Sequence, residues 1–277
     1  MTVGATRLMY VGVASLIERM AQPDFDSSAI IPWACPVPFF GEPAGARLAT
    51  VGINPSNNEF VSAAGGELNL QAQRLPTLKS LQLQSWKHAT TKHVRQILIA
   101  CRRYFDGNPY HRWFGVLERL LLPTGVSFYG KLPSAFHIDI VPWATKKKWG
   151  QLGVGERQAI LNSCGRSLAH VLQSAQALEL IVLNGSSAVR NFETVLGRKL
   201  ETTIVHEWTL PRSSGPDVPG ISYHAIVESI GSHSLGRSIT VAGYNHNLQS
   251  SYGVSRDVLR SIAGWVAESH AHHRQNV

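Results

Sequence analysis

Small and polar residues follow the ends of several apolar runs in this sequence, and they are the residues best suited to do chemistry. The first run is continued by the sequence GINPS at residues 52–56. Glycine and serine at such positions let backbone amides and hydroxyl groups approach phosphate groups closely. The later run ends carry Asp139; Asn184 with Gly185 and Ser186; and Ser232, His233, Ser234, Leu235 and Arg237.

The apolar runs are predicted to be strands, and the segments between them to be helices. Short, nearly continuous apolar strands that alternate with helices are typical of a parallel sheet covered on both faces. We therefore predict an α/β fold, a three-layer α/β/α sandwich with a central, mainly parallel sheet of four to five strands. The predicted strands are 48–54, 135–141, 178–185 and 223–230, with 202–208 as a further candidate, and the predicted helices are 88–105, 111–122, 153–176, 186–196 and a last one capped by Ser255.

The chain divides into an extension and one domain. Residues 1–45 are predicted to form a helix and a Pro-rich segment that wraps the surface, and residues 46–277 a single α/β domain. The 277 residues are 44% hydrophobic and 16% charged, which indicates a globular protein. No apolar run reaches the length of a membrane span, and the first twenty residues resemble an amphipathic helix more than a signal peptide.

Cysteine usage and missing motifs limit the classes of ligand. Cys35, Cys101 and Cys164 are far apart and odd in number, which favours a reducing, cytoplasmic environment of bacterial type and argues against a cysteine-ligated metal. The sequence contains no GxGxxG and no GxxxxGK[ST] motif, so no dinucleotide or P-loop nucleotide is indicated. We expect no metal and no cofactor.

The distribution of charge favours a polyanionic partner. The net charge is +8, and residues 68–105 contain seven lysines and arginines but no acidic residue. A second cluster, Lys146, Lys147 and Lys148, lies between Trp143 and Trp149. Basic residues interleaved with aromatic ones suit a phosphate backbone with exposed bases, although a solvated helix face is the alternative for the first run. We predict DNA as the partner, no membrane, and a monomeric protein.

Two of the motifs resemble those of the uracil-DNA glycosylase superfamily. GINPS is similar to the GINPG water-positioning motif of the mismatch-specific branch, and GSHSLGR at 231–237 resembles the superfamily's His-Pro-Ser-Pro-Leu loop, with Ser234 at the first Pro. The resemblance covers roughly residues 46–240. It implies the α/β/α sandwich and hydrolysis of a base–sugar bond in DNA without metal or cofactor. Since no lysine suggests a lyase step, a monofunctional DNA glycosylase that leaves an abasic site is expected.

The resemblance also implies roles for individual residues. Asn54 would hold the attacking water, and because an amide is a poor base, nearby Glu59 is a candidate for the missing carboxylate. His233 would donate a hydrogen bond to the O2 atom of the leaving base, and Leu235 would enter the gap that the flipped base leaves. The residues expected to contact the DNA backbone are Gly52, Ser56, Gly185, Ser186, Ser232, Ser234, Arg237, Lys146, Lys147 and Lys148.

Base recognition is where the sequence departs from the uracil-specific relatives. Asp139 stands about where those relatives carry an Asn that reads uracil. An ionised carboxylate only accepts hydrogen bonds, so it would repel the O4 atom of uracil and accept from the exocyclic amine of cytosine. Excising ordinary cytosine would be lethal, which predicts a modified cytosine, for example in phage DNA, and a role in antiviral defence. Phe60 and Asn184 are further candidates for contacting the base.

Alternatives remain open at this point. The substrate could be uracil or another deaminated base in a repair reaction, with Asp139 in a different role. The protein could also be a non-catalytic DNA-binding module or an enzyme acting on free nucleotides. Among the single residues, Asn54 could merely cap a turn, His233 could be an ordinary histidine, and Leu235 and Phe60 could belong to the core.

Overall fold

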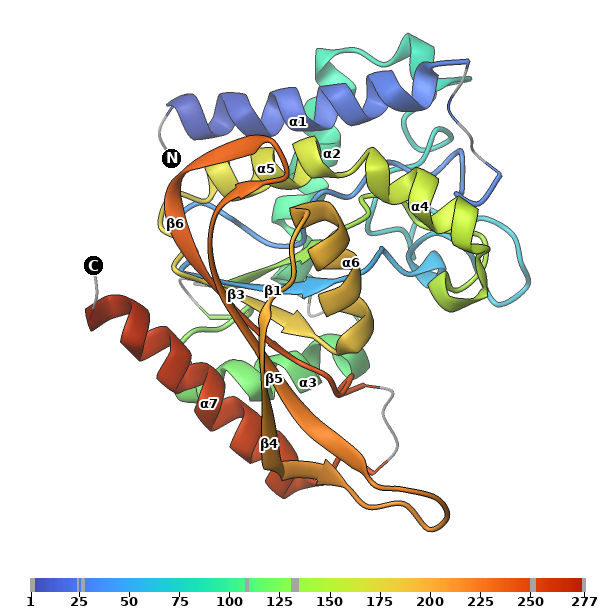
Figure 1. Cartoon of the computed structure of the whole chain (residues 1–277). Coiled ribbons are helices and arrows are strands. Elements are labelled where there is room, and N and C mark those ends of the chain that lie inside the picture. The colour runs from blue at the N-terminus through green and yellow to red at the C-terminus, as the bar shows by residue number, and fades with distance from the viewer. Residues whose placement is uncertain are drawn as a thin grey trace.

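The computed structural model describes residues 3–23, 25, 28–107, 110–130, 135–249 and 253–275. A twisted six-stranded sheet in the order β2-β1-β3-β6-β5-β4 forms its centre (Figure 1). The fold class is the predicted α/β sandwich, but the sheet has six strands instead of four or five. Their bounds are β1 Leu48–Gly52, β2 Ala135–Asp139, β3 Leu180–Asn184, β4 Glu201–Leu210, β5 Val218–Ile230 and β6 His233–Tyr244.

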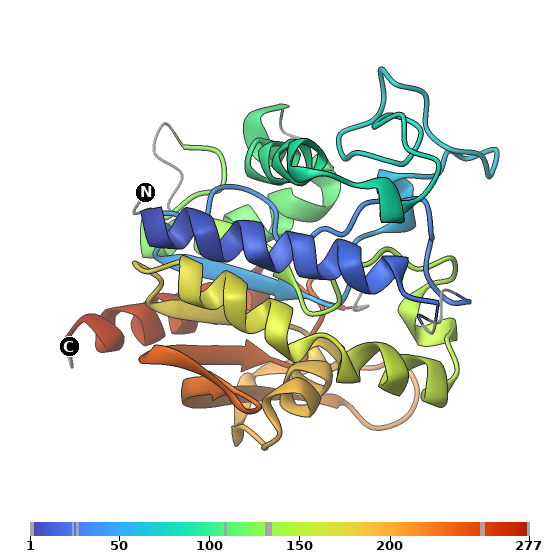
Figure 2. The same cartoon turned by 90° about the horizontal axis from the view of Figure 1, so that it is seen from above.

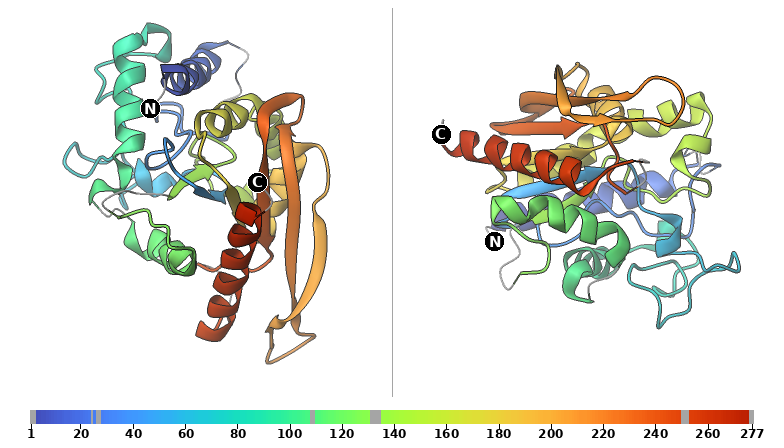
Figure 3. Two further views of the ribbon diagram at one scale, coloured as in Figure 1. Left: turned by 90° about the vertical axis from the view of Figure 1, so that its left-hand side faces the viewer. Right: turned by 90° about the horizontal axis from the view of Figure 1, so that it is seen from below.

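Helices cover both faces of the sheet. Helices α1 and α5 lie side by side over one face, while α3 and α7 contact each other on the opposite face (Figures 1 and 2). The bounds are α1 Val3–Ala21, α2 Thr91–Arg102, α3 His111–Leu121, α4 Val154–Asn162, α5 Gly165–Ser174, α6 Ser186–Leu196 and α7 Arg256–Gln275. The β5–β4 end of the sheet forms one side of the molecule (Figure 3).

Strands β2, β1, β3 and β6 are mutually parallel. Every residue of β1, β2 and β3 is buried, as their continuous apolar sequences predicted for strands covered on both faces. Pairing places Gly52 opposite Asp139 and Asn184 opposite Tyr244. These four residues therefore lie along the carboxyl edge of the parallel strands, where open α/β sheets bind their ligands.

The prediction of a parallel strand at 223–230 followed by a ligand loop was wrong. Strand β5 is antiparallel to β6, and Ile230 pairs with His233 across a turn made of Gly231 and Ser232. Gly231 has a φ of +54°, a conformation that glycine adopts without strain and that two-residue hairpin turns require. The segment expected to form a phosphate-binding loop is instead a hairpin turn and the start of β6.

One helical prediction is confirmed and another is corrected. Helix α7 begins at Arg256, and the hydroxyl of Ser255 accepts a hydrogen bond from the amide of Val258 at 3.1 Å, which confirms Ser255 as its cap. The predicted helix 153–176 is divided into α4 and α5 by a turn at Ser163 and Cys164.

The Pro-rich segment does not wrap the surface as predicted. Ile30, Cys35, Val37 and Phe39 are almost completely buried within the hydrophobic core. Its amide groups are paired in part with the loop after β2, since Ile31 donates to Ala144 and Val37 to Pro142. The segment therefore supports the loop that follows Asp139. Among the described residues, no helix combines the length and the hydropathy needed to cross a bilayer.

Helix α7 is attached to the amino edge of the sheet by an ionic cluster. Glu179, which precedes β3, accepts hydrogen bonds from Arg47 at 2.9 and 3.0 Å and lies 2.6 Å from His270 of α7. Burial alone would raise the pKa of Glu179, but the hydrogen bonds and charges of Arg47 and His270 outweigh it and lower that pKa. The carboxylate therefore stabilises the fold above its unfolded pKa of about 4.3, and this stabilisation is lost as the pH falls through the lower folded value.

Substituting Glu179→Gln is accordingly expected to destabilise the protein at neutral pH. We expect the melting temperature to fall by roughly 2 °C at pH 7, and the difference from the wild type to shrink below pH 4. Thermal unfolding of both proteins between pH 3 and pH 8 measures this. A deficit of the same size at pH 3 would contradict the proposed electrostatic origin.

Candidate functional site

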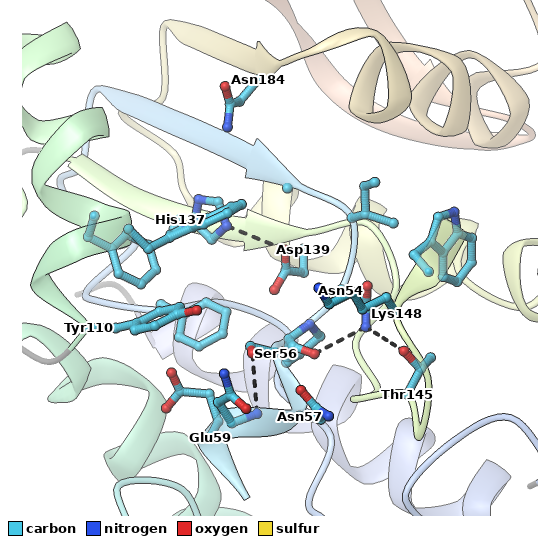
Figure 4. A pocket seen from close by; sticks show the side chains of 18 of the residues that line it. Asn54, Ser56, Asn57, Glu59, Tyr110, His137, Asp139, Thr145, Lys148 and Asn184 are labelled. Carbon is cyan, nitrogen blue, oxygen red and sulfur yellow. Dashed lines mark hydrogen bonds and ion pairs between the residues drawn. The ribbon is translucent and has the colours of Figure 1, made fainter. Parts of the chain in front are cut away.

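A cavity of about 470 Å³ opens at the carboxyl edge of the parallel strands (Figure 4). Its walls come from the ends of β1, β2 and β3, from the loop after β6, and from the start of α3. The residues singled out from the sequence that line it are Gly52, Asn54, Ser56, Glu59, Asp139, Lys147, Lys148 and Asn184. Segments more than 130 residues apart in the chain thus meet at one site.

The amide of Asn54 is held in one orientation. Its Nδ2 atom donates to the carbonyl of Pro55 at 3.1 Å and to Oγ1 of Thr145 at 3.0 Å (Figure 4). Thr145, nearly fully buried, donates in turn to the carbonyl of Lys147 at 2.6 Å. Since both protons of the amide are engaged, Oδ1 is the atom left to accept, and it has no partner within the described residues. An oxygen fixed in this way can orient a water molecule.

Asp139 lies beside a histidine that was not among the predicted site residues. The Nε2 atom of His137 is 3.4 Å from Oδ1 of Asp139, and its Nδ1 atom is 2.7 Å from the hydroxyl of Thr50. All three side chains are at most 6% exposed. His137 and Asp139 are two residues apart in β2, so their side chains point to the same face of the sheet. Two polar residues at this spacing in an otherwise apolar strand are the sequence signal that could have identified His137 as a site residue.

Gly52 provides the space for this pair. A Cβ atom at position 52 would lie 2.5 Å from Oδ1 of Asp139 and 2.9 Å from Nε2 of His137. Both distances are shorter than real Cβ contacts, so a side chain at position 52 would force Asp139 and His137 to shift. Gly52 was expected to contact a phosphate. In the structure, its lack of a side chain is what allows Asp139 and His137 to occupy their positions.

Substituting Gly52→Ala is therefore expected to displace Asp139 and His137. Because misplacing a positioned group by about 1 Å can reduce a rate about 100-fold, a reaction that depends on this pair should slow by that order. Activity assays of the variant measure the loss. The matched control is Gly155→Ala in α4, where a Cβ atom meets nothing within 4 Å and φ is not positive, as at Gly52. Full activity in the Gly52 variant would show that the pair can shift without consequence.

Glu59 is engaged on both oxygens. Arg74 donates to Oε2 through two nitrogens, at 2.9 and 3.1 Å, and the hydroxyl of Tyr104 donates to Oε1 at 2.7 Å. Burial, followed by the negative charge of Glu59, raises the pKa of Tyr104 far above its usual value, so its hydroxyl remains a donor. The carboxylate is buried and lines the cavity, but its arrangement suits a structural ion pair better than a base that accepts a proton from water.

Phe60 does not line the cavity, contrary to its predicted role in stacking on a base. Its side chain is fully buried and packs edge-on against Trp33. The aromatic side chains that do reach the cavity include Tyr110 and Trp113, whose rings are parallel within 8° at a centroid distance of 6.4 Å. Tyr110 is 36% exposed and has a φ of +53°, an unusual conformation for a residue with a side chain.

Asn184 organises the loop after β6 instead of presenting its amide freely. Its Nδ2 atom donates to Gln249 at 2.6 Å, and Oδ1 accepts from the hydroxyl of Tyr244 and the amide of Leu248. The absence of a side chain at Gly185 allows the loop to approach, because a Cβ atom there would lie 2.9 Å from that of Asn247. Asn247 consequently lines the cavity, and it was not predicted because the run that forms β6 was not recognised as a strand.

The lysine cluster is divided between two environments. Lys147 and Lys148 are exposed and line the cavity, where their charges face any ligand that enters. Lys146 lies outside the cavity lining and donates to the carbonyl of Ser28 at 2.9 Å. Of the serines predicted to contact phosphate, Ser56 lines the cavity and accepts from the amide of Asn58, whereas Ser186 lies at the start of α6.

The residues of the predicted His-containing loop lie away from the cavity. Thr240 of β6 pairs with Leu180, the first residue of β3, and His233 precedes Thr240 by seven residues. His233 therefore lies beyond the amino edge of the parallel strands, whereas the cavity opens at their carboxyl edge. The hairpin tip instead packs near α5, where Gln173 donates to the carbonyl of Ser234, and Ser232 beside it is exposed. The antiparallel direction of β5 is the reason, because the carboxyl end of an antiparallel strand points to the opposite edge.

Leu235 and Arg237 have structural positions. Leu235 is 4% exposed and belongs to the core, which was the alternative interpretation of this residue. Arg237 is half-buried and donates to the carbonyls of Leu172 and Ala175 at the end of α5. Burial lowers the pKa of Arg237. Neither residue lines the cavity, so neither contacts a ligand bound there.

No family model matches this chain, and no curated protein matches it.

Proposed function

We propose that this protein is a monofunctional DNA glycosylase that hydrolyses the bond between a modified base and its deoxyribose and leaves an abasic site. The observation that carries the proposal is that Asn54 and Asp139 line one cavity whose wall also presents Lys147 and Lys148. An oriented acceptor for water, an acceptor for a base and two cations for phosphate are what this reaction requires. The resemblance of GINPS to the glycosylase motif supports the same assignment.

The cavity suits a base that has left the DNA helix. A base bonded to its sugar inside a duplex cannot be reached, so such enzymes flip the nucleotide into a pocket. The volume of about 470 Å³ falls within the range of about 300–1,000 Å³ that pockets for drug-sized ligands occupy. It leaves room for a flipped base together with part of its sugar and phosphate.

The reaction develops positive charge on the sugar and negative charge on the departing base. Asn54 would hold the attacking water through Oδ1, which is positioning rather than deprotonation. Glu59 would act by stabilising the wall that carries Asn54, since Arg74 and Tyr104 engage its oxygens. For the departing base, we assign to Asn247 the stabilising contact first expected of His233, because Asn247 follows the last parallel strand and lines the cavity.

Asp139 would select the base. A carboxylate accepts from the exocyclic amine of cytosine and repels the O4 atom of uracil. The proposed substrate is therefore a modified cytosine, and excision of such a base from phage DNA would make the protein an antiviral enzyme. Excision of uracil or another deaminated base is the alternative, and a cleavage experiment separates the two.

A panel of oligonucleotides tests the proposal. Single-stranded and duplex DNA carrying uracil, hypoxanthine, 5-methyl-, 5-hydroxymethyl- or glucosylated cytosine would be incubated with the protein in EDTA and then treated with alkali. Strand breaks confined to a modified cytosine would support the proposal in full. Breaks at uracil would support a glycosylase and refute the choice of base. Tight, salt-sensitive binding without breaks would refute the enzyme in favour of a DNA-binding module.

A further inference from the structure

The buried residues Thr50 and His137 form a chain that leads to Asp139. Thr50 lies in the middle of β1, and its hydroxyl is 2.7 Å from Nδ1 of His137 in the neighbouring strand β2. The opposite ring nitrogen, Nε2, is 3.4 Å from Oδ1 of Asp139. Thr50 is fully buried and does not line the cavity, whereas His137 and Asp139 do.

We propose that Thr50 and His137 are positioning residues that hold the carboxylate of Asp139 in the one orientation that selects the base. This inference rests on the proposed function. Thr50 would fix the ring of His137, and His137 would fix one oxygen of Asp139. The second oxygen, Oδ2, would then face the cavity and accept from the exocyclic amine.

Hydrogen-bond chemistry sets the direction of the chain. A carboxylate can only accept, so the proton between His137 and Asp139 belongs to Nε2. A neutral ring protonated at Nε2 has an acceptor at Nδ1, and the hydroxyl of Thr50 donates to it. The distance of 3.4 Å is long for a hydrogen bond, but such contacts are often long in the absence of ligand and shorten when the substrate binds.

The surroundings restrict the imidazole ring further. The ring of Phe114 lies edge-on at a centroid distance of 5.2 Å, and that of Phe40 is tilted at 5.7 Å. Gly52 leaves the space through which Nε2 approaches the carboxylate. His137 thus has packing contacts that hold its plane and a hydrogen bond from Thr50 that holds Nδ1 in place. Removing the hydroxyl of Thr50 would leave Nδ1 without a hydrogen-bond donor while leaving the packing in place.

The test compares Thr50→Val, which removes the hydroxyl, with Thr50→Ser, which keeps it. The first readout is the pair of ¹⁵N chemical shifts of the His137 ring, which reports the tautomer and the hydrogen bond at Nδ1 and does not depend on activity. We expect a proton on Nε2 and a hydrogen-bonded Nδ1 in the wild type and in Thr50→Ser. In Thr50→Val we expect the Nδ1 resonance to move to that of an imidazole nitrogen without a hydrogen-bond donor. Thermal unfolding of each variant checks that it is folded.

The second readout is the ratio of kcat/KM for the cleaved cytosine derivative to kcat/KM for uracil. We expect this ratio to fall roughly tenfold in Thr50→Val and to be retained in Thr50→Ser, because a positioned group has been loosened but not removed. A wild-type ratio of kcat/KM values together with a wild-type Nδ1 shift in Thr50→Val would overturn the inference, as would equal losses of selectivity in both variants. If the wild type cleaves no oligonucleotide, the proposed function fails, and the ring shifts alone decide whether Thr50 orients His137.

Discussion

Replacing Asn54 with alanine is expected to slow base release by about 100- to 1,000-fold, with little change in the affinity for DNA. In the proposed reaction the amide oxygen of Asn54 would hold the attacking water, and alanine has no atom at that position. The lost interaction would be made in the transition state, so kcat should fall while binding persists. Single-turnover cleavage measures the rate, and fluorescence anisotropy with labelled DNA measures the affinity.

Two further variants give this experiment its controls. His233→Ala should retain activity within a few-fold, because His233 lies outside the cavity lining and at the opposite end of β6 from the site. Thr145→Val should cause a partial loss, because it removes one of the two acceptors that hold the amide of Asn54. Retained activity in Asn54→Ala together with a large loss in His233→Ala would refute the assignment of both residues.

The parallel part of the fold could be predicted from the sequence because each element there carries a local signal. The runs LATVG and LIVLN are continuous and apolar, as strands buried on both faces must be. Helix α6 begins at Ser186 and ends at Leu196, as its periodicity predicted. Together with the run AFHID of β2, these strands were enough to place Asn54, Asp139 and Asn184 at one edge of the sheet.

The hairpin of β5 and β6 was missed for a physical reason. A Gly-Ser pair between two strand-like segments is a signal for a two-residue hairpin turn, but the same residues also suit a phosphate-binding loop. The resemblance favoured the second interpretation. Strand direction depends on which partner an apolar run pairs with, and the sequence of one strand does not specify its partner.

The choice between the two carboxylates of the cavity also required tertiary contacts. Arg74 and Tyr104, which engage Glu59, are 15 and 45 residues away along the chain. Oδ1 of Asp139 lies beside His137, and His137 in turn contacts Thr50, which is 87 residues away along the chain. No regular spacing in the sequence predicts a contact between residues so far apart. Side chains that look equivalent in sequence can therefore differ in the oxygens they leave available.

Substituting Asp139→Asn is expected to change which base is released. Asparagine keeps the shape of the side chain but adds an N–H donor. Because His137 would donate to the amide oxygen, the Nδ2 group would face the cavity, where it can pair with O4 of uracil and opposes the amine of cytosine. We expect kcat/KM for the cytosine derivative to fall roughly tenfold to a hundredfold and that for uracil to rise. Competition assays with both oligonucleotides measure the ratio directly.

The double variant Asp139→Asn, Thr50→Val connects this result to the buried chain. If Thr50 orients His137, and His137 orients residue 139, the two substitutions share one network and their effects on selectivity should not be additive. An asparagine whose orientation is no longer fixed can turn either its oxygen or its nitrogen to the base, so the double variant should discriminate less than Asp139→Asn alone. Additive effects would show that Thr50 acts on selectivity by a route that does not pass through residue 139. An unchanged preference for the cytosine derivative in Asp139→Asn would instead mean that another group in the cavity selects the base.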